Sequence, residues 1–260
     1  MRPAPISRRE AISRIALGAA TVGIGCSLGD SPEFAPLNNG RLSARPLANA
    51  GPANPGLSPL LLDSGRDGVV FVPDNLVTGE PAPLVVMLHG AGGSARAIEE
   101  VLRPITSDAG CVLLFPDSRA PTWDAIGGGY GLDVEVLDSA LTSVFRNMTV
   151  DPDRIAIAGF SDGASYALGV GRINGDLFTR VLAFSPGFLP PGEAHGKPPV
   201  FISHGIDDQV LPLEATSRII VEELGAQGYE VTFREFPGGH AMSNSLTREA
   251  LGLVTGTTGS

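Results

Sequence analysis

The sequence predicts an α/β domain in which a mostly parallel sheet is covered by helices on both faces. Short apolar runs alternate with helix-like segments along most of the chain. Of its 260 residues, 43% are hydrophobic and 18% are charged, which is enough to bury one sizeable core. The Gly-rich and polar motifs follow the ends of apolar runs, where the ligand sites of parallel sheets gather.

The expected strands are short apolar runs rich in Val, Ile, Leu and Phe, bounded by Gly, Pro, Asn or Asp. In chain order, they are residues 69–72, 84–88, 111–115, 155–158, 181–184, 200–202 and 231–236. The expected helices, which lie between them, are residues 95–103, 134–146, 162–171, 214–224 and 243–251. Since a helix separates most consecutive strands, these strands are expected to run parallel.

The N-terminus is expected to be an export signal. Arg8 and Arg9 precede a mildly apolar run over residues 15–25 that is too short for a stable membrane helix, so residues 1–26 read as a twin-arginine signal peptide. The signal ends in G-I-G-C, which loosely resembles a lipobox. A lipoprotein anchored to a membrane through Cys26 and a soluble periplasmic or secreted protein both stay open.

Residues 27–59 are rich in Pro, Asn, Gly and Ala and show no periodicity. They are expected to form a flexible leader, and residues 60–255 to form the folded domain. The formal net charge of −10 argues against nucleic-acid binding. The two cysteines, Cys26 and Cys111, offer no metal-ligand spacing, and we expect neither a metal nor a cofactor. The oligomeric state stays open.

The segment from Gly159 to Gly163 reads G-F-S-D-G and joins an expected strand to an expected helix. A reversal this tight leaves no room for a Cβ on either side of Ser161 and holds its hydroxyl in a strained, accessible turn. A purely structural Gly-rich turn is the alternative. The interpretation as a nucleophile gains support from three further loops.

The first loop, His89 to Gly93, follows the expected strand at 84–88. Its glycines allow the amide of Ala91, together with the amide of Asp162, to hold the oxyanion of a tetrahedral intermediate. The alternative is an ordinary strand-to-helix loop.

The second and third loops offer an acid and a base. Asp207 and Asp208 follow the strand at 200–202, and either carboxylate could orient a histidine. His240 follows the strand at 231–236 and lies beside two glycines. It is the only histidine that comes after both aspartates, because the others are His89, His195 and His204. The order Ser, Asp, His is that of hydrolases built on such a sheet.

Together these motifs resemble α/β-hydrolases of the phospholipase/carboxylesterase type, which include acyl-protein thioesterases. There is further likeness to exported esterases related to polyhydroxyalkanoate depolymerases. The resemblance covers residues 68–252. The matching motifs are H-G-x-G-G at 89–93, G-F-S-x-G at 159–163, H-G-x-x-D-x-x-V-P at 204–212 and G-G-H at 238–240.

The resemblance implies the α/β-hydrolase fold and a catalytic triad of Ser161, Asp208 and His240. It places the acid at Asp208 and the oxyanion hole at the amides of Ala91 and Asp162. Residues 122–124 resemble the family's S-W-[FY]-D segment without its second aromatic residue, so Gly90 and Trp123 are expected to bind substrate. For Trp123, plain core packing is an equal alternative.

The implied activity is hydrolysis of carboxylic esters of short to medium acyl chain through an acyl-enzyme. Small or polymeric esters are the expected partners. A polyester depolymerase or an acyl thioesterase with the same triad is an alternative, as is a non-catalytic binding protein on this scaffold. A metal hydrolase is a further rival, with His204, Asp207, Asp208 and His240 as its ligands.

Overall fold

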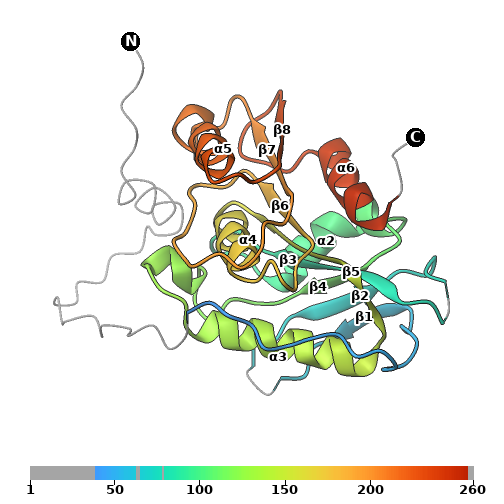
Figure 1. Ribbon diagram of the computed structural model, residues 1–260. Coiled ribbons are helices and arrows are strands. Elements are labelled where there is room, and N and C mark those ends of the chain that lie inside the picture. The colour runs from blue at the N-terminus through green and yellow to red at the C-terminus, as the bar shows by residue number, and fades with distance from the viewer. Residues whose placement is uncertain (1–38, 63–64, 78, 257–260) are drawn as a thin grey trace, which may run out of the picture.

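The computed structural model describes residues 39–62, 65–77 and 79–256. These residues form one eight-stranded sheet in the order β1-β2-β4-β3-β5-β6-β7-β8 (Figure 1). The strands are β1 (Gly56–Pro59), β2 (Val69–Val72), β3 (Ala82–Leu88), β4 (Val112–Phe115), β5 (Val150–Phe160), β6 (Arg180–Phe184), β7 (Val200–Gly205) and β8 (Val231–Phe236). β2 pairs antiparallel with both β1 and β4, and the pairs from β4 to β8 are parallel. The predicted α/β fold is confirmed.

Helices cover both faces of the sheet. They are α2 (Ala95–Thr106), α3 (Leu132–Asn147), α4 (Asp162–Ile173), α5 (Ser217–Ala226) and α6 (Asn244–Thr255), with short 3-10 turns η1 (Asp124–Gly127) and η2 (Leu213–Ala215). Buried residues of α3, α4 and α5 form one apolar cluster with the sheet, and those of α2 and α6 form another on the opposite face. The predicted helix at 214–224 is thus two pieces, η2 and α5.

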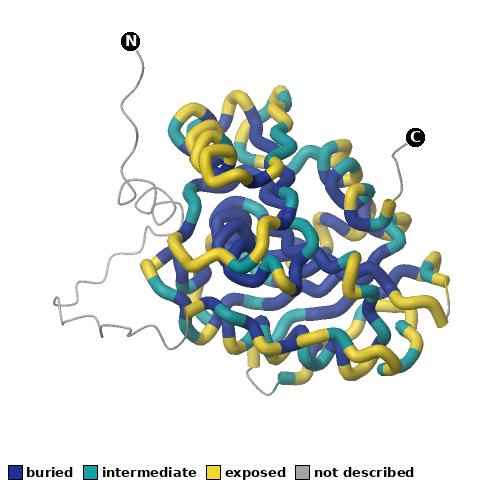
Figure 2. The backbone as a smooth tube through the Cα atoms, in the orientation of Figure 1, coloured by how far each residue is buried: buried dark blue, intermediate teal, exposed yellow. Residues whose placement is uncertain are grey.

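The residues of the central strands are buried, as Figure 2 shows by their dark blue colour. All seven residues of β3 are buried, and successive side chains enter opposite clusters because a strand has a period of two. Leu84 and Val86 thus face α3 and α4, and Val85 and Met87 face α2 and α6. Such two-sided burial explains the continuous apolar runs in the sequence. None of the described helices is long and apolar enough to cross a membrane.

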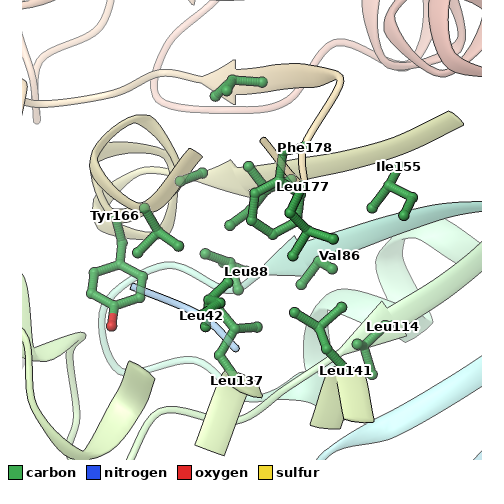
Figure 3. Packing of buried hydrophobic residues seen from close by; sticks show 14 of the residues in the cluster. Leu42, Val86, Leu88, Leu114, Leu137, Leu141, Ile155, Tyr166, Leu177 and Phe178 are labelled. Atoms are coloured by element: carbon green, nitrogen blue, oxygen red, sulfur yellow. The ribbon is translucent and has the colours of Figure 1, made fainter. Parts of the chain in front are cut away.

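The expectation of a flexible leader over residues 27–59 is wrong for the part that the structure describes. Leu42 is 3% exposed and packs in the cluster of α3 and α4, where Figure 3 labels it near Leu137. The Leu42 amide donates to Asn174 Oδ1 at 2.8 Å, and Arg41 pairs with Asp176 at 2.8 Å. β1 also lies in this segment and pairs with β2.

This segment, residues 39–59, lacks periodicity because specific polar contacts, instead of a regular helix or sheet face, hold most of it. The backbone amides of Ser43 and Ala44 both donate to Asp138 Oδ1 on α3, at 2.7 and 2.8 Å. The folded domain therefore extends at least to residue 39. The predicted signal peptide and Cys26 lie outside the described residues.

Candidate active site

Ser161 lies at the sharp turn between β5 and α4. Its φ of 59° is in the left-handed region, which is costly for a residue with a side chain. A Cβ on Gly159 would lie 2.2 Å from the carbonyl oxygen of Gly163, and one on Gly163 would lie 2.4 Å from that of His89. The two glycines are therefore required by close backbone approach, as the sequence indicated.

Three side chains from three loops meet at this turn. Ser161 Oγ lies 2.8 Å from His240 Nε2, and His240 Nδ1 lies 2.6 Å from Asp208 Oδ2. Ser161 follows β5, Asp208 follows β7 and His240 follows β8, so parallel strands deliver all three to one edge of the sheet. The His240 side chain is 15% exposed and its ring lies beside Phe160, with ring centroids 4.9 Å apart.

The loop with the aspartates is held against the loop with the histidine. The amide of Asp207 donates to the carbonyl of Gly238 at 2.9 Å, and a Cβ on Gly205 would lie 2.3 Å from the Gly239 oxygen. This interlock leaves Asp207 exposed and turns Asp208 inward, where it is 3% exposed. Of the two aspartates, Asp208 is the one that meets His240.

Asp208 accepts hydrogen bonds on both carboxylate oxygens. The amides of Val210 and Leu211 each donate to Oδ1 at 2.8 Å. Oδ2 faces two histidines, His240 Nδ1 at 2.6 Å and His204 Nε2 at 3.1 Å. Burial alone would favour the neutral acid, but the donors from His204, His240 and Leu211 outweigh it and lower the pKa of Asp208 far below its usual range.

The predicted oxyanion loop lies directly against the serine. A Cβ on Gly90 would lie 3.3 Å from Ser161 Cβ, and the Gly92 amide donates to the Pro121 carbonyl at 2.7 Å. The backbone amides of Asp162 and Ala91 both act on the Asp162 carboxyl, which they favour in its ionised form. Asp162 directly follows Ser161, and Ala91 directly follows Gly90, which packs against Ser161. The oxyanion role of their two amides stays a prediction.

Trp123 packs against the loop of residues 89–93. It is 1% exposed, its Nε1 donates to the carbonyl of His89 at 2.9 Å, and its ring stacks on Tyr166 with centroids 5.1 Å apart. A side chain so completely covered does not line a surface site. The substrate-binding prediction for Trp123 is therefore wrong, and the packing alternative holds. Gly90 keeps its place beside Ser161.

The side chain of Asp162 is a feature that sequence reasoning missed. It is fully buried and accepts a hydrogen bond from the hydroxyl of Thr122 on Oδ2, while Oδ1 has no hydrogen-bond partner. Burial raises the pKa of this carboxyl to about 7, against the opposing effect of Thr122 and neighbouring amides. No local signal reveals the pair, because Thr122 lies 40 positions away in the sequence.

The residues expected to bind a metal in the rival interpretation make other contacts in this structure. His204, Asp208 and His240 hydrogen-bond with one another or with backbone groups. In residues 39–62, 65–77 and 79–256, no group of three or more His, Cys, Asp or Glu is arranged to hold a metal ion.

Known proteins resemble the chain in sequence. The profile of the Phospholipase/Carboxylesterase family matches residues 134–251. Acyl-protein thioesterase 1 of Gibberella zeae is 30% identical over 238 residues, which cover 74% of this chain and 95% of that protein. The chain belongs to the phospholipase/carboxylesterase family. The likeness to polyhydroxyalkanoate-depolymerase-related esterases stays a prediction.

A second relative in sequence and one solved structure also resemble the chain. A protein named "Probable feruloyl esterase C" from Aspergillus oryzae is 27% identical over 183 residues, and the chain spans 66% of its length, slightly less than two thirds. The solved structure of esterase PE8 shares the fold with a TM-score of 0.59, at 23% identity, and covers 72% of this chain and 98% of PE8.

Proposed function

We propose that the chain is a serine carboxylesterase that works through an acyl-enzyme. His240 removes the proton of Ser161 as its Oγ attacks the ester carbonyl, and then protonates the leaving alcohol. Asp208 orients His240 and stabilises the imidazolium. Water, activated by the same histidine, cleaves the acyl-enzyme and returns the serine hydroxyl.

One observation carries this proposal. The serine, histidine and aspartate form a continuous hydrogen-bonded chain of 2.8 and 2.6 Å, although they come from three loops far apart in the sequence. The strained φ of 59° at Ser161 supports it, since strain of this kind gathers at functional sites. A non-catalytic binding protein would have no need of this alignment.

The oxyanion formed during the attack requires donors on the other side of the carbonyl. We assign that role to the amides of Ala91 and Asp162, because Asp162 follows Ser161 at the start of α4 and Ala91 follows Gly90, which packs against Ser161. The amide of Asp162 also gains from the helix, because the N-terminus of α4 carries partial positive charge. The proposed chemistry requires neither metal nor cofactor.

The proposed substrates are carboxylic esters of short to medium acyl chain. The family member from Gibberella zeae is named a thioesterase and the Aspergillus oryzae relative a feruloyl esterase, so thioesters and hydroxycinnamoyl esters belong among the candidates. The partly exposed His240 favours a shallow site that admits a substrate from the surface. Polyester stays an alternative substrate.

A substrate panel tests the proposal. Wild type and Ser161→Ala are compared on p-nitrophenyl acetate, butyrate and octanoate, methyl ferulate, an acyl thioester and a polyhydroxybutyrate film. We expect the wild type to be fastest on the acetate or butyrate, and the variant to lose at least about 10³-fold. Activity that survives in Ser161→Ala, or that a chelator abolishes in the wild type, contradicts the serine mechanism.

We further propose that residues 1–26 direct export. Replacement of Arg8 and Arg9 by lysine should leave the enzyme active and retain it in the cytoplasm, because a receptor reads the paired arginines. Cell fractionation tests this, and unchanged export of the double-lysine form contradicts it. Labelling with a fatty acid, compared with Cys26→Ala, separates an anchored lipoprotein from a soluble product.

A further inference from the structure

A second histidine contacts the acid of the proposed triad, at the same carboxylate oxygen as the base. His204 lies in β7 and is fully buried. Its Nε2 is 3.1 Å from Asp208 Oδ2 and 2.8 Å from the carbonyl oxygen of Leu211. Its Nδ1 is 2.7 Å from the hydroxyl of Ser217, the first residue of α5.

These contacts determine which nitrogen carries the proton. Both partners of His204 Nε2 are oxygen acceptors, so this nitrogen must be the donor. Nδ1 faces the hydroxyl of Ser217, which can donate, so a neutral ring satisfies every contact. His204 therefore shares one N–H between the Leu211 carbonyl, at 2.8 Å, and Asp208 Oδ2, at 3.1 Å, without adding a charge to the site.

The second donor changes what Asp208 does for His240. Amides of the loop hold Oδ1 and the two imidazoles contact Oδ2, so the orientation of the rigid carboxylate depends on both sets of donors. A carboxylate oxygen that faces two donors attracts each of them less strongly than it would attract a single donor. In the described structure the ionisable groups that contact Asp208 are His204 and His240, and the one that contacts His204 is Asp208.

We propose that His204 is a positioning residue. It holds Oδ2 of Asp208 toward His240 and weakens the attraction between the Asp208 carboxylate and the imidazolium form of His240. The proposal rests on the proposed esterase function. Polar contacts thus extend from Ser161 through His240, Asp208 and His204 to Ser217, with His204 Nε2 3.1 Å from Asp208 Oδ2. This series of contacts begins at Ser161, which is 6% exposed, and ends on α5, so a rigid element of the scaffold helps to fix the orientation of the base.

Two amide variants separate positioning from packing. The side-chain nitrogen of glutamine in His204→Gln can occupy the place of Nε2 and still donate to Asp208. His204→Asn has the same amide group, but it reaches only the place of Nδ1 and the hydroxyl of Ser217. Both place an uncharged polar group in the same buried site, so their difference reports the contact with Asp208.

We expect His204→Gln to keep kcat within about threefold of the wild type, and His204→Asn to lose about tenfold or more with little change in KM. In the asparagine variant the imidazolium form of His240 gains the full attraction of Asp208. The acidic limb of kcat/KM therefore moves to higher pH. A packing defect alone would lower stability without moving this limb.

Nitrogen NMR of the wild type tests the same inference without any variant. A protonated Nε2 and an unprotonated Nδ1 on His204 support it, and a proton on Nδ1 alone overturns it. Asparagine and glutamine variants that match the wild type in kcat and pH profile also overturn it. Ser161→Ala is run beside them: hydrolysis by that variant refutes the esterase proposal itself, whereas its inactivity leaves any failure with His204.

Discussion

The buried carboxyl of Asp162 makes stability depend on pH in a way that a single substitution can isolate. The side chain is fully buried, its Oδ1 has no hydrogen-bond partner, and its pKa is raised to about 7 by burial. We expect Asp162→Asn to remove the cost of ionising this group. Asparagine imitates the neutral acid in shape and remains neutral at every pH.

The sign follows from proton linkage. In the unfolded chain this carboxyl loses its proton near its ordinary pKa of 3.8, whereas in the folded protein it holds the proton to about pH 7. The contribution of this carboxyl to the free energy of unfolding is therefore fully present below about pH 4, and it is lost as the pH rises to about 7. The difference between 3.8 and about 7, at about 1.4 kcal/mol for each pH unit, limits the loss to about 4 kcal/mol.

Urea unfolding at pH 4.5 and pH 8 measures the effect. Asp162→Asn should be close to the wild type at pH 4.5 and more stable at pH 8, by up to about 4 kcal/mol in the free energy of unfolding. Asp108→Asn, at an exposed site, is the matched control for the change in charge. A difference between wild type and Asp162→Asn that is the same at both pH values would mean that the Asp162 carboxyl does not titrate in this way.

Three further predictions concern the acid, the thiol and the N-terminal segment. Asp208→Asn should lower kcat by about 10³-fold or more, and the exposed Asp207→Asn by only a few fold; equal losses in an ester assay contradict the assignment. Burial raises the pKa of Cys111 to about 12, so a thiol reagent at pH 8 should label it only after unfolding, as peptide mapping can check. Leu42→Ala should cost about 2–4 kcal/mol of unfolding free energy in urea titrations, against about 0.5 or less for Leu47→Ala, which is 50% exposed; equal costs mean that the segment is not part of the core.

Much of the fold could be predicted from the sequence because its signals are local. Two-sided burial makes β3 to β7 rich in apolar residues, and the glycines around Ser161 are demanded by contacts within a few residues of the turn. The resemblance supplied Asp208, and the structure adds the reason: the amide of Asp207 is tied to Gly238, which turns the next side chain inward.

The remaining features could not be predicted because they depend on contacts between distant segments. Residues 39–59 look like a linker until Leu42 meets α3 and α4. The pairing of Thr122 with Asp162 and the burial of Trp123 depend on how one loop folds across the start of α4. His204 is part of the matched motif, but only the folded strand shows that its Nε2 faces Asp208.

The central claim is that Ser161 is the nucleophile, and covalent labelling tests it most directly. The full chain is treated with a fluorophosphonate, digested and mapped by mass spectrometry. We expect one adduct, on the peptide that contains Ser161, that is lost in Ser161→Ala and forms much more slowly in His240→Ala, because the histidine activates the serine. An adduct on another residue, or an active enzyme that takes no label, would contradict it.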